Sequence, residues 1–326
     1  IRLRRLCFSS YERSKTTTMA PTPPTVFRLE HGAAGRRAVA VLVLVCAQSA
    51  CAFNLFQQPK TAAPAKAWAS ATVATPTTTT VPPAADMAVA RTSVIGGNWK
   101  MNPGSVAEAT ELATSICAVA DALNGEAIVF PPYPYLSVVS DIVKETPVHL
   151  GAQLIYTEEK GAFTGAVAPS MVKSLGCTHV LAGHSERRVV FGETDASINL
   201  QVLKTIEYGM TPVLCIGETK EEYDANLVEA VCALQLAKDL AGVPKDAVQD
   251  LVIAYEPVWA IGTGLVCPAD VAQKTHEYIR HKLAEMYDAE TAAAIRIQYG
   301  GSANAGNAPE LSSFPDIDGF LVGGAS

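Results

Sequence analysis

The chain has 326 residues, of which 49% are hydrophobic and 17% charged, so it holds enough apolar side chains for one or two globular domains. Charge is divided unevenly: residues 1–87 hold 10 Lys and Arg against 3 Asp and Glu, and residues 88–326 hold 15 against 29. The acidic body argues against a nucleic-acid partner. It also requires any anionic ligand to be bound by local groups rather than by the overall field.

Residues 1–87 are predicted to be a targeting leader. Arg36 and Arg37 precede an apolar run over 38–47, which is short for a membrane span, and an Ala-x-Ala-like site precedes Phe53. Residues 57–85 are rich in Ala, Thr and Pro and almost free of acids, so they cannot form a core. The two parts together resemble the presequence of complex algal plastids. Plain secretion and mitochondrial import are the alternatives, and no membrane contact is expected of the mature form.

Residues 88–326 alternate short apolar runs with helical patterns, which predicts parallel strands joined by crossover helices. In chain order the strands are expected at 94–96, 127–130, 148–151, 180–182, 212–216, 251–255, 296–299 and 318–322. The main helices are expected near 105–123, up to 144, and at 195–208, 221–240 and 268–287. The count and length predict an α/β fold of the (β/α)₈ barrel type. A doubly wound open sheet is the alternative, but Asn98-Trp99-Lys100 is not the glycine loop that it needs after its first strand.

One strand ends at a single carboxylate. The apolar run 251–255 stops at Glu256, and Pro257 forces a turn into an apolar, glycine-containing loop that looks able to move. Trp259 and Ile261 would desolvate the charged carboxylate and make it a better base. The alternative is a glutamate that forms an ordinary salt bridge at the end of a strand.

In a barrel the carboxyl ends of all strands meet at one face. A cation, an imidazole, two carboxylates and several glycine-bearing loops follow these ends, and glycine loops after the last two strands commonly bind phosphate. The sequence therefore predicts a site for a small phosphorylated molecule. Taken singly, each residue is also compatible with an ordinary structural role, as a solvated lysine, a core histidine, a turn glycine or a surface charge. The residues are Asn98, Lys100, His184, Glu186, Glu256, Gly262, Ser302, Gly323 and Gly324.

No metal site and no cofactor are predicted, because the histidines are scattered in the sequence and no histidine–carboxylate pair has ligand spacing. The body has an odd number of cysteines and no CxxC motif, which favours free thiols in a reducing compartment. These cysteines are Cys117, Cys177, Cys215, Cys232 and Cys267.

Six segments together resemble the triosephosphate isomerase family, in order, over residues 91–326. They are 97–102 (GNWKMN), 161–165 (GAFTG), 183–188 (GHSERR), 255–264 (YEPVWAIGTG), 299–302 (YGGS) and 321–326 (LVGGAS). The resemblance implies an isomerase that interconverts dihydroxyacetone phosphate and glyceraldehyde 3-phosphate through an enediol(ate), without a cofactor. The alternative is a barrel kept as a non-catalytic phosphate-binding protein.

The resemblance also implies residue roles. Glu256 would be the base and His184 the electrophile, with Lys100 against the phosphate and the developing negative charge. Residues 257–267 would form a closing lid, and Thr164 lies in a loop that reaches the neighbouring subunit of a homodimer. The remaining roles are Asn98 to orient substrate, Glu186 and Ser185 to support the base, and Gly262, Ser302, Gly323 and Gly324 to bind phosphate.

The chain departs from the family pattern at several points. Ala166 stands where a glutamate commonly pairs across the dimer, and Leu154 stands where a polar residue is common. The second hinge of the lid is 265–267 (LVC) rather than the frequent Lys-Thr-Ala. The final helix of the barrel is missing from the given chain after Ser326, so the natural protein is expected to continue with an apolar-striped helix. Residues 88–326 would form the barrel domain.

Overall fold

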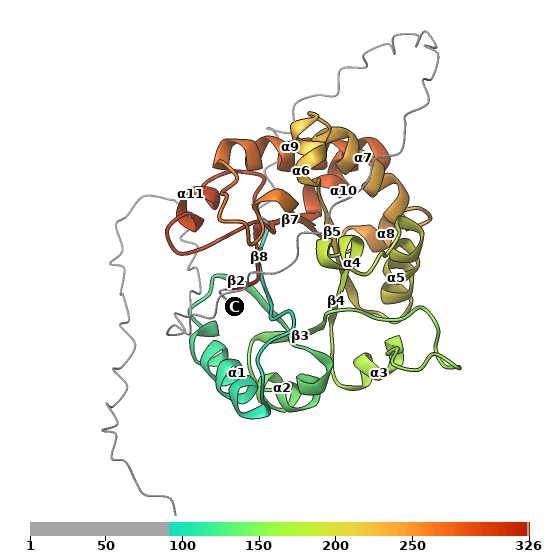
Figure 1. Ribbon diagram of the computed structural model, residues 1–326, viewed down its shortest axis with the longest axis vertical. Coiled ribbons are helices and arrows are strands. Elements are labelled where there is room, and N and C mark those ends of the chain that lie inside the picture. Colours follow the sequence, from blue (N-terminus) through green and yellow to red (C-terminus); the bar gives the residue numbers. More distant parts are fainter. Residues whose placement is uncertain (1–90, 325) are drawn as a thin grey trace, which may run out of the picture. The chain divides into compact units, whose positions relative to one another are not determined.

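The structure is a computed structural model and describes residues 91–324 and residue 326. Eight parallel strands close into a barrel in chain order (Figure 1). β8 pairs with β1, with Val94 opposite Gly319, and this pairing completes the ring. The predicted (β/α)₈ barrel is therefore confirmed, and the open sheet is excluded. The strands are β1 (Ser93–Asn98), β2 (Gly125–Phe130), β3 (Val148–Ala152), β4 (His179–Ala182), β5 (Thr211–Ile216), β6 (Val252–Tyr255), β7 (Arg296–Tyr299) and β8 (Gly319–Val322).

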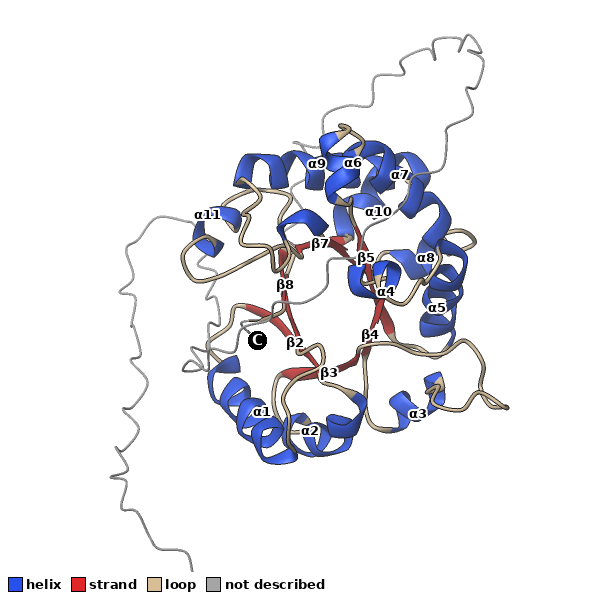
Figure 2. Ribbon diagram, in the orientation of Figure 1, coloured by secondary structure: helices blue, strands red, loops and turns tan. Residues whose placement is uncertain are grey.

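Helices surround the ring of strands (Figure 2). Among the described residues, no helix is long and apolar enough to cross a membrane. Several short helices were not predicted, because a helix of one or two turns shows no full apolar period. The helices are α1 (Val106–Ala120), α2 (Leu136–Val143), α3 (Pro169–Ser174), α4 (Ser185–Val189), α5 (Asp195–Glu207), α6 (Lys220–Asp224), α7 (Val228–Asp239), α8 (Lys245–Val248), α9 (Ala269–Met286), α10 (Ala289–Ala294) and α11 (Ala308–Leu311), with 3₁₀ turns η2 (Tyr133–Tyr135) and η3 (Val258–Ala260).

Alternate strand residues point into the barrel, where they form a closed apolar core. Phe130 fills much of this space: a Cβ added to Gly151 would lie 2.3 Å from its ring, so only glycine fits there. The intervening strand residues, such as Ala127, Val129 and Leu150, pack outward in a separate cluster with helices α1 and α2. This alternation fixes which side chains reach either mouth of the barrel. The interior residues are Val94, Ile128, Phe130, Leu181, Val213, Cys215, Val252, Ala254 and Leu321.

The long helix predicted over 221–240 is wrong, since the chain forms α6 and α7 with a break between them. Asn226 adopts a left-handed conformation at φ 56°. The N–H of Leu227 donates to the carbonyl of Glu222 and closes the last turn of α6. Asparagine tolerates this conformation better than most residues because its short polar side chain can bond locally. The apolar period continues through the break, so periodicity alone could not reveal it.

Asn226→Ala is expected to lower the free energy of unfolding by about 1 kcal/mol, because an alanine Cβ is strained at positive φ. Asn226→Gly is the matched control and should retain stability within a few tenths of a kcal/mol. Urea unfolding of the two variants measures the difference. Equal stability of the alanine and glycine variants would mean that backbone conformation is not what separates the two helices.

Two predictions concern residues outside the described part of the chain. The predicted leader, residues 1–87, lies outside the described residues, which begin at residue 91. The final helix would follow β8, after which the structure describes Gly323, Gly324 and Ser326. The prediction of free thiols is confirmed for the five cysteines of the described residues, of which four are buried and Cys117 is partly exposed.

Candidate active site

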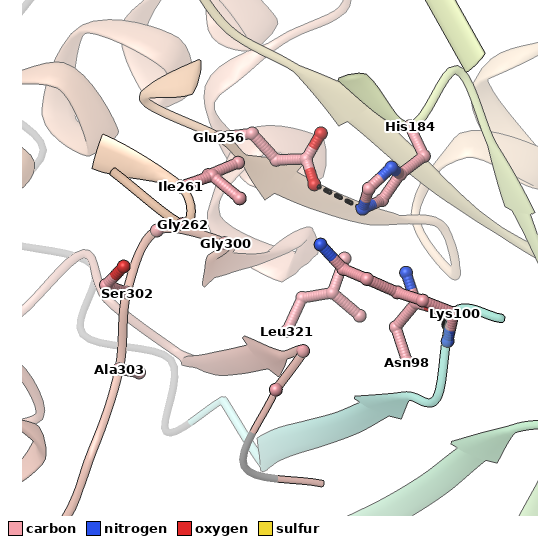
Figure 3. Close-up of a pocket in the computed structure, with 13 residues that line it drawn as sticks. Asn98, Lys100, His184, Glu256, Ile261, Gly262, Gly300, Ser302, Ala303 and Leu321 are labelled. Atoms are coloured by element: carbon pink, nitrogen blue, oxygen red, sulfur yellow. Dashed lines mark hydrogen bonds and ion pairs between the residues drawn. The ribbon is translucent and has the colours of Figure 1, made fainter. Parts of the chain in front are cut away.

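A cavity of about 370 Å³ opens at the end of the barrel where the strands terminate (Figure 3). All eight residues predicted to bind or transform substrate line it, although they come from five different strand ends and the lid. Ser185 and Glu186 contact members of this set. Thr164 is exposed on the loop between β3 and α3 and is not part of the lining. The lining residues are Asn98, Lys100, His184, Glu256, Ile261, Gly262, Gly300, Gly301, Ser302, Ala303, Leu321, Gly323 and Gly324.

Glu256 follows β6 and is only 2% exposed. One carboxylate oxygen, Oε1, lies 3.0 Å from Nε2 of His184. The other, Oε2, accepts the backbone N–H of Ser185 at 2.8 Å. Both oxygens are thus held by donors, and the carboxylate points across the mouth of the cavity. Glycine at position 300 is required by this packing, since an added Cβ would lie 2.8 Å from Cγ of Glu256.

His184 is the N-cap of α4, and this position defines its hydrogen-bonding state. Its Nδ1 accepts the backbone N–H of Glu186 at 3.2 Å. A ring whose Nδ1 accepts a hydrogen bond is the neutral tautomer with its proton on Nε2. The Nε2–H therefore points at Glu256, and His184 can act as a neutral hydrogen-bond donor.

Arg188 fixes the segment that carries His184. Its Nε donates to the carbonyl of Gly183 at 2.7 Å, and its Nη2 donates to Asp239 at 2.6 Å and to the carbonyl of Cys215 at 2.9 Å. The start of α4 is thereby tied to the end of β5 and to α7. The sequence alone gave Arg188 no role beyond its place in the segment 183–188, because nothing in the spacing indicated a buried partner.

Lys100 has a left-handed backbone at φ 54°, which is unusual for a residue with a long side chain. Its N–H donates to Oδ1 of Asn98 at 3.0 Å, and its carbonyl accepts from Nε2 of Gln153 at 2.7 Å. These two bonds hold the strained conformation, as is common where a side chain must be aimed at a site. Gln153 was not predicted from the sequence. It directly follows β3, so the rule that selected the other strand-end residues could have found it.

Among the described residues that line the cavity, Lys100 supplies the positive charge through its ammonium group. Its Nζ donates to Oε1 of Glu186 at 2.8 Å, and the glutamate side chain is 47% exposed. This half-exposed pair is weak enough to exchange for an anionic ligand. Gly262 and Gly324 have no atom within 4 Å of an added Cβ, so their backbones face open space. One positive charge and backbone groups that face open space suit a phosphate group.

The loop over 257–267 is anchored at its start by Glu218. Trp259 Nε1 donates to Oε1 of this carboxylate at 2.7 Å, and the hydroxyl of Tyr255 donates to the same oxygen at 3.1 Å. Leu265 and Val266 are 48% and 56% exposed, whereas Cys267 is buried. The loop thus has buried residues at both ends and an exposed stretch over 262–266, while Ile261 and Gly262 line the cavity.

Burial raises the pKa of the Glu218 carboxyl above its usual range, even though the Trp259 hydrogen bond acts in the opposite direction. The folded state therefore binds this proton more tightly than the unfolded chain. The cost of the buried charge is present above the folded pKa, and it disappears as the pH falls below the ordinary glutamate value.

Glu218→Gln is expected to be more stable than the wild type at pH 8, because it keeps an acceptor for Trp259 and removes the buried charge. The difference should shrink as the pH falls to about 4.5. Urea midpoints from about pH 4.5 to 8 measure it, with Glu310→Gln as a surface control. A constant difference across this range would contradict the assignment of the charge cost to Glu218.

Comparison with known proteins identifies the family of this chain. A family model described as triosephosphate isomerase matches residues 93–326. The triosephosphate isomerase of Chlorobium phaeovibrioides is 49% identical over 238 residues, which cover 72% of this chain and 94% of that protein. The enzymes of Chloroflexus aurantiacus and Clostridium novyi are 48% and 44% identical, each with 72% of this chain and 94% of its own length covered. The chain belongs to the triosephosphate isomerase family and is an isomerase that interconverts dihydroxyacetone phosphate and glyceraldehyde 3-phosphate.

Proposed function

We propose that the isomerisation proceeds through an enediol(ate) with Glu256 as the base and His184 as the electrophile. This pairing of a carboxylate with a neutral imidazole is the known arrangement of the family. The observation that carries it here is the 3.0 Å approach of Glu256 Oε1 to His184 Nε2 at the mouth of a cavity lined by Lys100. Glu256 moves the proton between the two carbon atoms, and the Nε2–H of His184 polarises the carbonyl oxygen.

The remaining lining residues are proposed to hold the phosphate. Lys100 exchanges its contact with Glu186 for the phosphate and the developing oxyanion, while Asn98 keeps the lysine backbone in place. The backbone N–H groups near Gly262, Gly323 and Gly324 and the hydroxyl of Ser302 donate to phosphate oxygens. The Ser302 hydroxyl donates to the Ala260 carbonyl at 2.6 Å, so this bond must rearrange when phosphate binds.

Lid closure is proposed to complete the site. Residues 257–267 cover the cavity and exclude water, which stops an enediolate phosphate from losing its phosphate group. Glu256 accepts the N–H of Ser185 and must leave this donor to reach the substrate carbon. Ser185 thus positions Glu256 before substrate binds and takes no part in the proton transfer.

A deuterium experiment tests the proposed route. The purified full chain is assayed for triose phosphate isomerisation in D₂O, and the product is examined for deuterium on the carbon beside the carbonyl. Turnover with incorporation is expected, because a carboxylate exchanges its proton with solvent. Phosphate-dependent binding without turnover would favour the non-catalytic barrel. Turnover without any deuterium in the product would contradict exchange of the transferred proton with solvent at the base, while leaving the isomerase activity intact.

A homodimer is proposed as the active assembly. Large apolar side chains are exposed in the segments that follow strands β1 and β4: Met101 is 94% exposed, Val190 71% and Phe191 64%. The loop with Thr164 follows β3, between these strands in the barrel. Apolar exposure of this extent is typical of an interface. Ala166 removes one cross-dimer ion pair of the family pattern without removing this apolar surface.

Light scattering on a sizing column tests the dimer. The wild type is expected at the mass of two chains, and Phe191→Glu is expected to shift it toward one chain. Leu234→Glu on α7 is the matched control, because Leu234 is also exposed, at 53%, but lies on the helical outside. A monomeric wild type, or equal effects of both variants, would contradict the proposed interface.

Plastid import through the secretory route is proposed for the leader, with mitochondrial import and secretion as alternatives. Its support is the sequence pattern of residues 1–87 alone. A fluorescent fusion of residues 19–90 is expected in the plastid, and replacement of Phe53 by Ala is expected to misroute it. Accumulation of the unaltered fusion outside plastids would contradict the proposal.

A further inference from the structure

Two histidines and a glutamate meet at the mouth of the barrel opposite the active site. Glu126, His149 and His179 lie at the starts of β2, β3 and β4, whereas the catalytic residues follow strand ends. Each occupies an inward position, since Ala127, Leu150 and Val180 beside them pack outward. The strand register brings these three side chains together although they are distant in sequence.

The distances among their polar atoms match those of ligands on one metal ion. Oε1 of Glu126 lies 3.2 Å from Nε2 of His179 and 3.7 Å from Nε2 of His149. One ligand atom from each residue lies within 4.8 Å of the others. Two ligands that are each about 2.05 Å from a tetrahedral zinc ion are about 3.3 Å apart. An ion placed between the three atoms therefore requires only small side-chain rotations.

The second ring nitrogen of His179 already has the partner that a metal ligand needs. Nδ1 lies 2.8 Å from Oγ1 of Thr178, and this hydroxyl can donate to the carbonyl of Leu150 at 3.3 Å. With the proton on Nδ1, the ring donates to Thr178 and leaves the Nε2 lone pair free for a cation. Metal-bound histidines commonly hold their second nitrogen in this way, which fixes the ring and its tautomer.

The other contacts of the cluster leave one carboxylate oxygen of Glu126 for an ion. Arg296 pairs with Oε2 of Glu126, so Oε1 remains for the two histidines. The side chain of His179 is 5% exposed and that of His149 is 45% exposed, so the cluster is built on a buried ligand and open on one side. Water can supply the fourth ligand from that side. The arginine charge nearby will weaken cation binding relative to a site without it.

We propose that Glu126, His149 and His179 bind one divalent transition-metal ion of the zinc class, separate from the active site. Two neutral imidazoles and one carboxylate form the ligand set that zinc accepts. An ion at this position would cross-link the first halves of three adjacent strands. It would stabilise the folded chain without taking part in the isomerisation.

Titration of the full chain with Zn²⁺ alone, by calorimetry and by thermal unfolding, tests the site. The wild type is expected to bind Zn²⁺ saturably, with a rise in Tm and no change in kcat. His149→Ala removes one ligand at a half-exposed position and is expected to weaken binding at least about tenfold. His281→Ala is the matched control, since His281 is 49% exposed beside Glu285 on α9 and should leave the affinity unchanged.

Cobalt distinguishes this site from cysteine ligation. Co²⁺ bound by two histidines and a carboxylate should give a visible tetrahedral spectrum without a thiolate charge-transfer band, and His149→Ala should abolish it. Three results would overturn the proposal: no saturable Zn²⁺ binding, equal affinity of the wild type and His149→Ala, or a cobalt spectrum with a thiolate band that survives in His149→Ala.

Discussion

Glu256→Gln is expected to lower kcat by about 10²–10⁴-fold, because it preserves the shape of the side chain and removes the base. The amide has a single acceptor oxygen, whereas the carboxylate accepts from both Ser185 and His184. In the variant the amide NH₂ group therefore faces another hydrogen-bond donor, either the N–H of Ser185 or the Nε2–H of His184. This costs about 1–3 kcal/mol in stability. Steady-state kinetics in both directions, together with a thermal melt, measure the two effects separately.

Glu310→Gln is the control for this substitution, since Glu310 is exposed and outside the cavity. It should leave both kcat and the melt unchanged. Near-normal kcat in a folded Glu256→Gln variant would remove Glu256 from the mechanism. Loss of the cooperative melt would show instead that the buried contacts of this carboxylate hold the end of β6 together.

Lys100→Met is expected to lower kcat/KM by about 10- to 150-fold, which corresponds to about 1.5–3 kcal/mol for a hydrogen bond to a charged group. The methionine nearly keeps the length of the side chain and removes the cation of the cavity lining. Because the lysine is proposed to face both the phosphate and the reacting oxygen, KM should rise and kcat should fall. Glu186 is half-exposed, so it loses little when its partner is removed.

Lys144→Met is the control, because Lys144 also forms an ion pair, with Asp141 at 3.2 Å, but is exposed and lies at the end of α2. Its kinetic constants should equal those of the wild type. Unchanged KM and kcat in Lys100→Met would contradict the assignment of this lysine to the phosphate. A fall in kcat alone would indicate contact with the reacting oxygen only.

The sequence was sufficient to predict the barrel and eight of the thirteen residues that line its cavity. Each strand is a short apolar run with a polar or glycine-containing end, and parallel strands bring these ends together. That rule by itself places Asn98, His184 and Glu256 in one site. The same rule, applied to every strand, would also have included Gln153.

Other features depend on contacts that no local pattern encodes. The left-handed backbone of Lys100 is held by Asn98 and Gln153, the second of which is 53 residues away. The break at Asn226 is a local conformation inside a continuing apolar period. The histidine–glutamate cluster at the other mouth arises from strand register. Sequence spacing alone gives no signal for any of the three.

The pairing of β1 with β8 has a consequence for how the chain folds. Arg91 donates to Asp318 across 227 positions of sequence, and Val94 lies opposite Gly319 in the same seam. Contacts between such distant residues form late, since a long loop must be closed before they stabilise anything. Asn98 and Lys100 lie on one side of this seam, and Gly323 lies on the other. We therefore expect the active site to be completed only when this seam closes, late in folding.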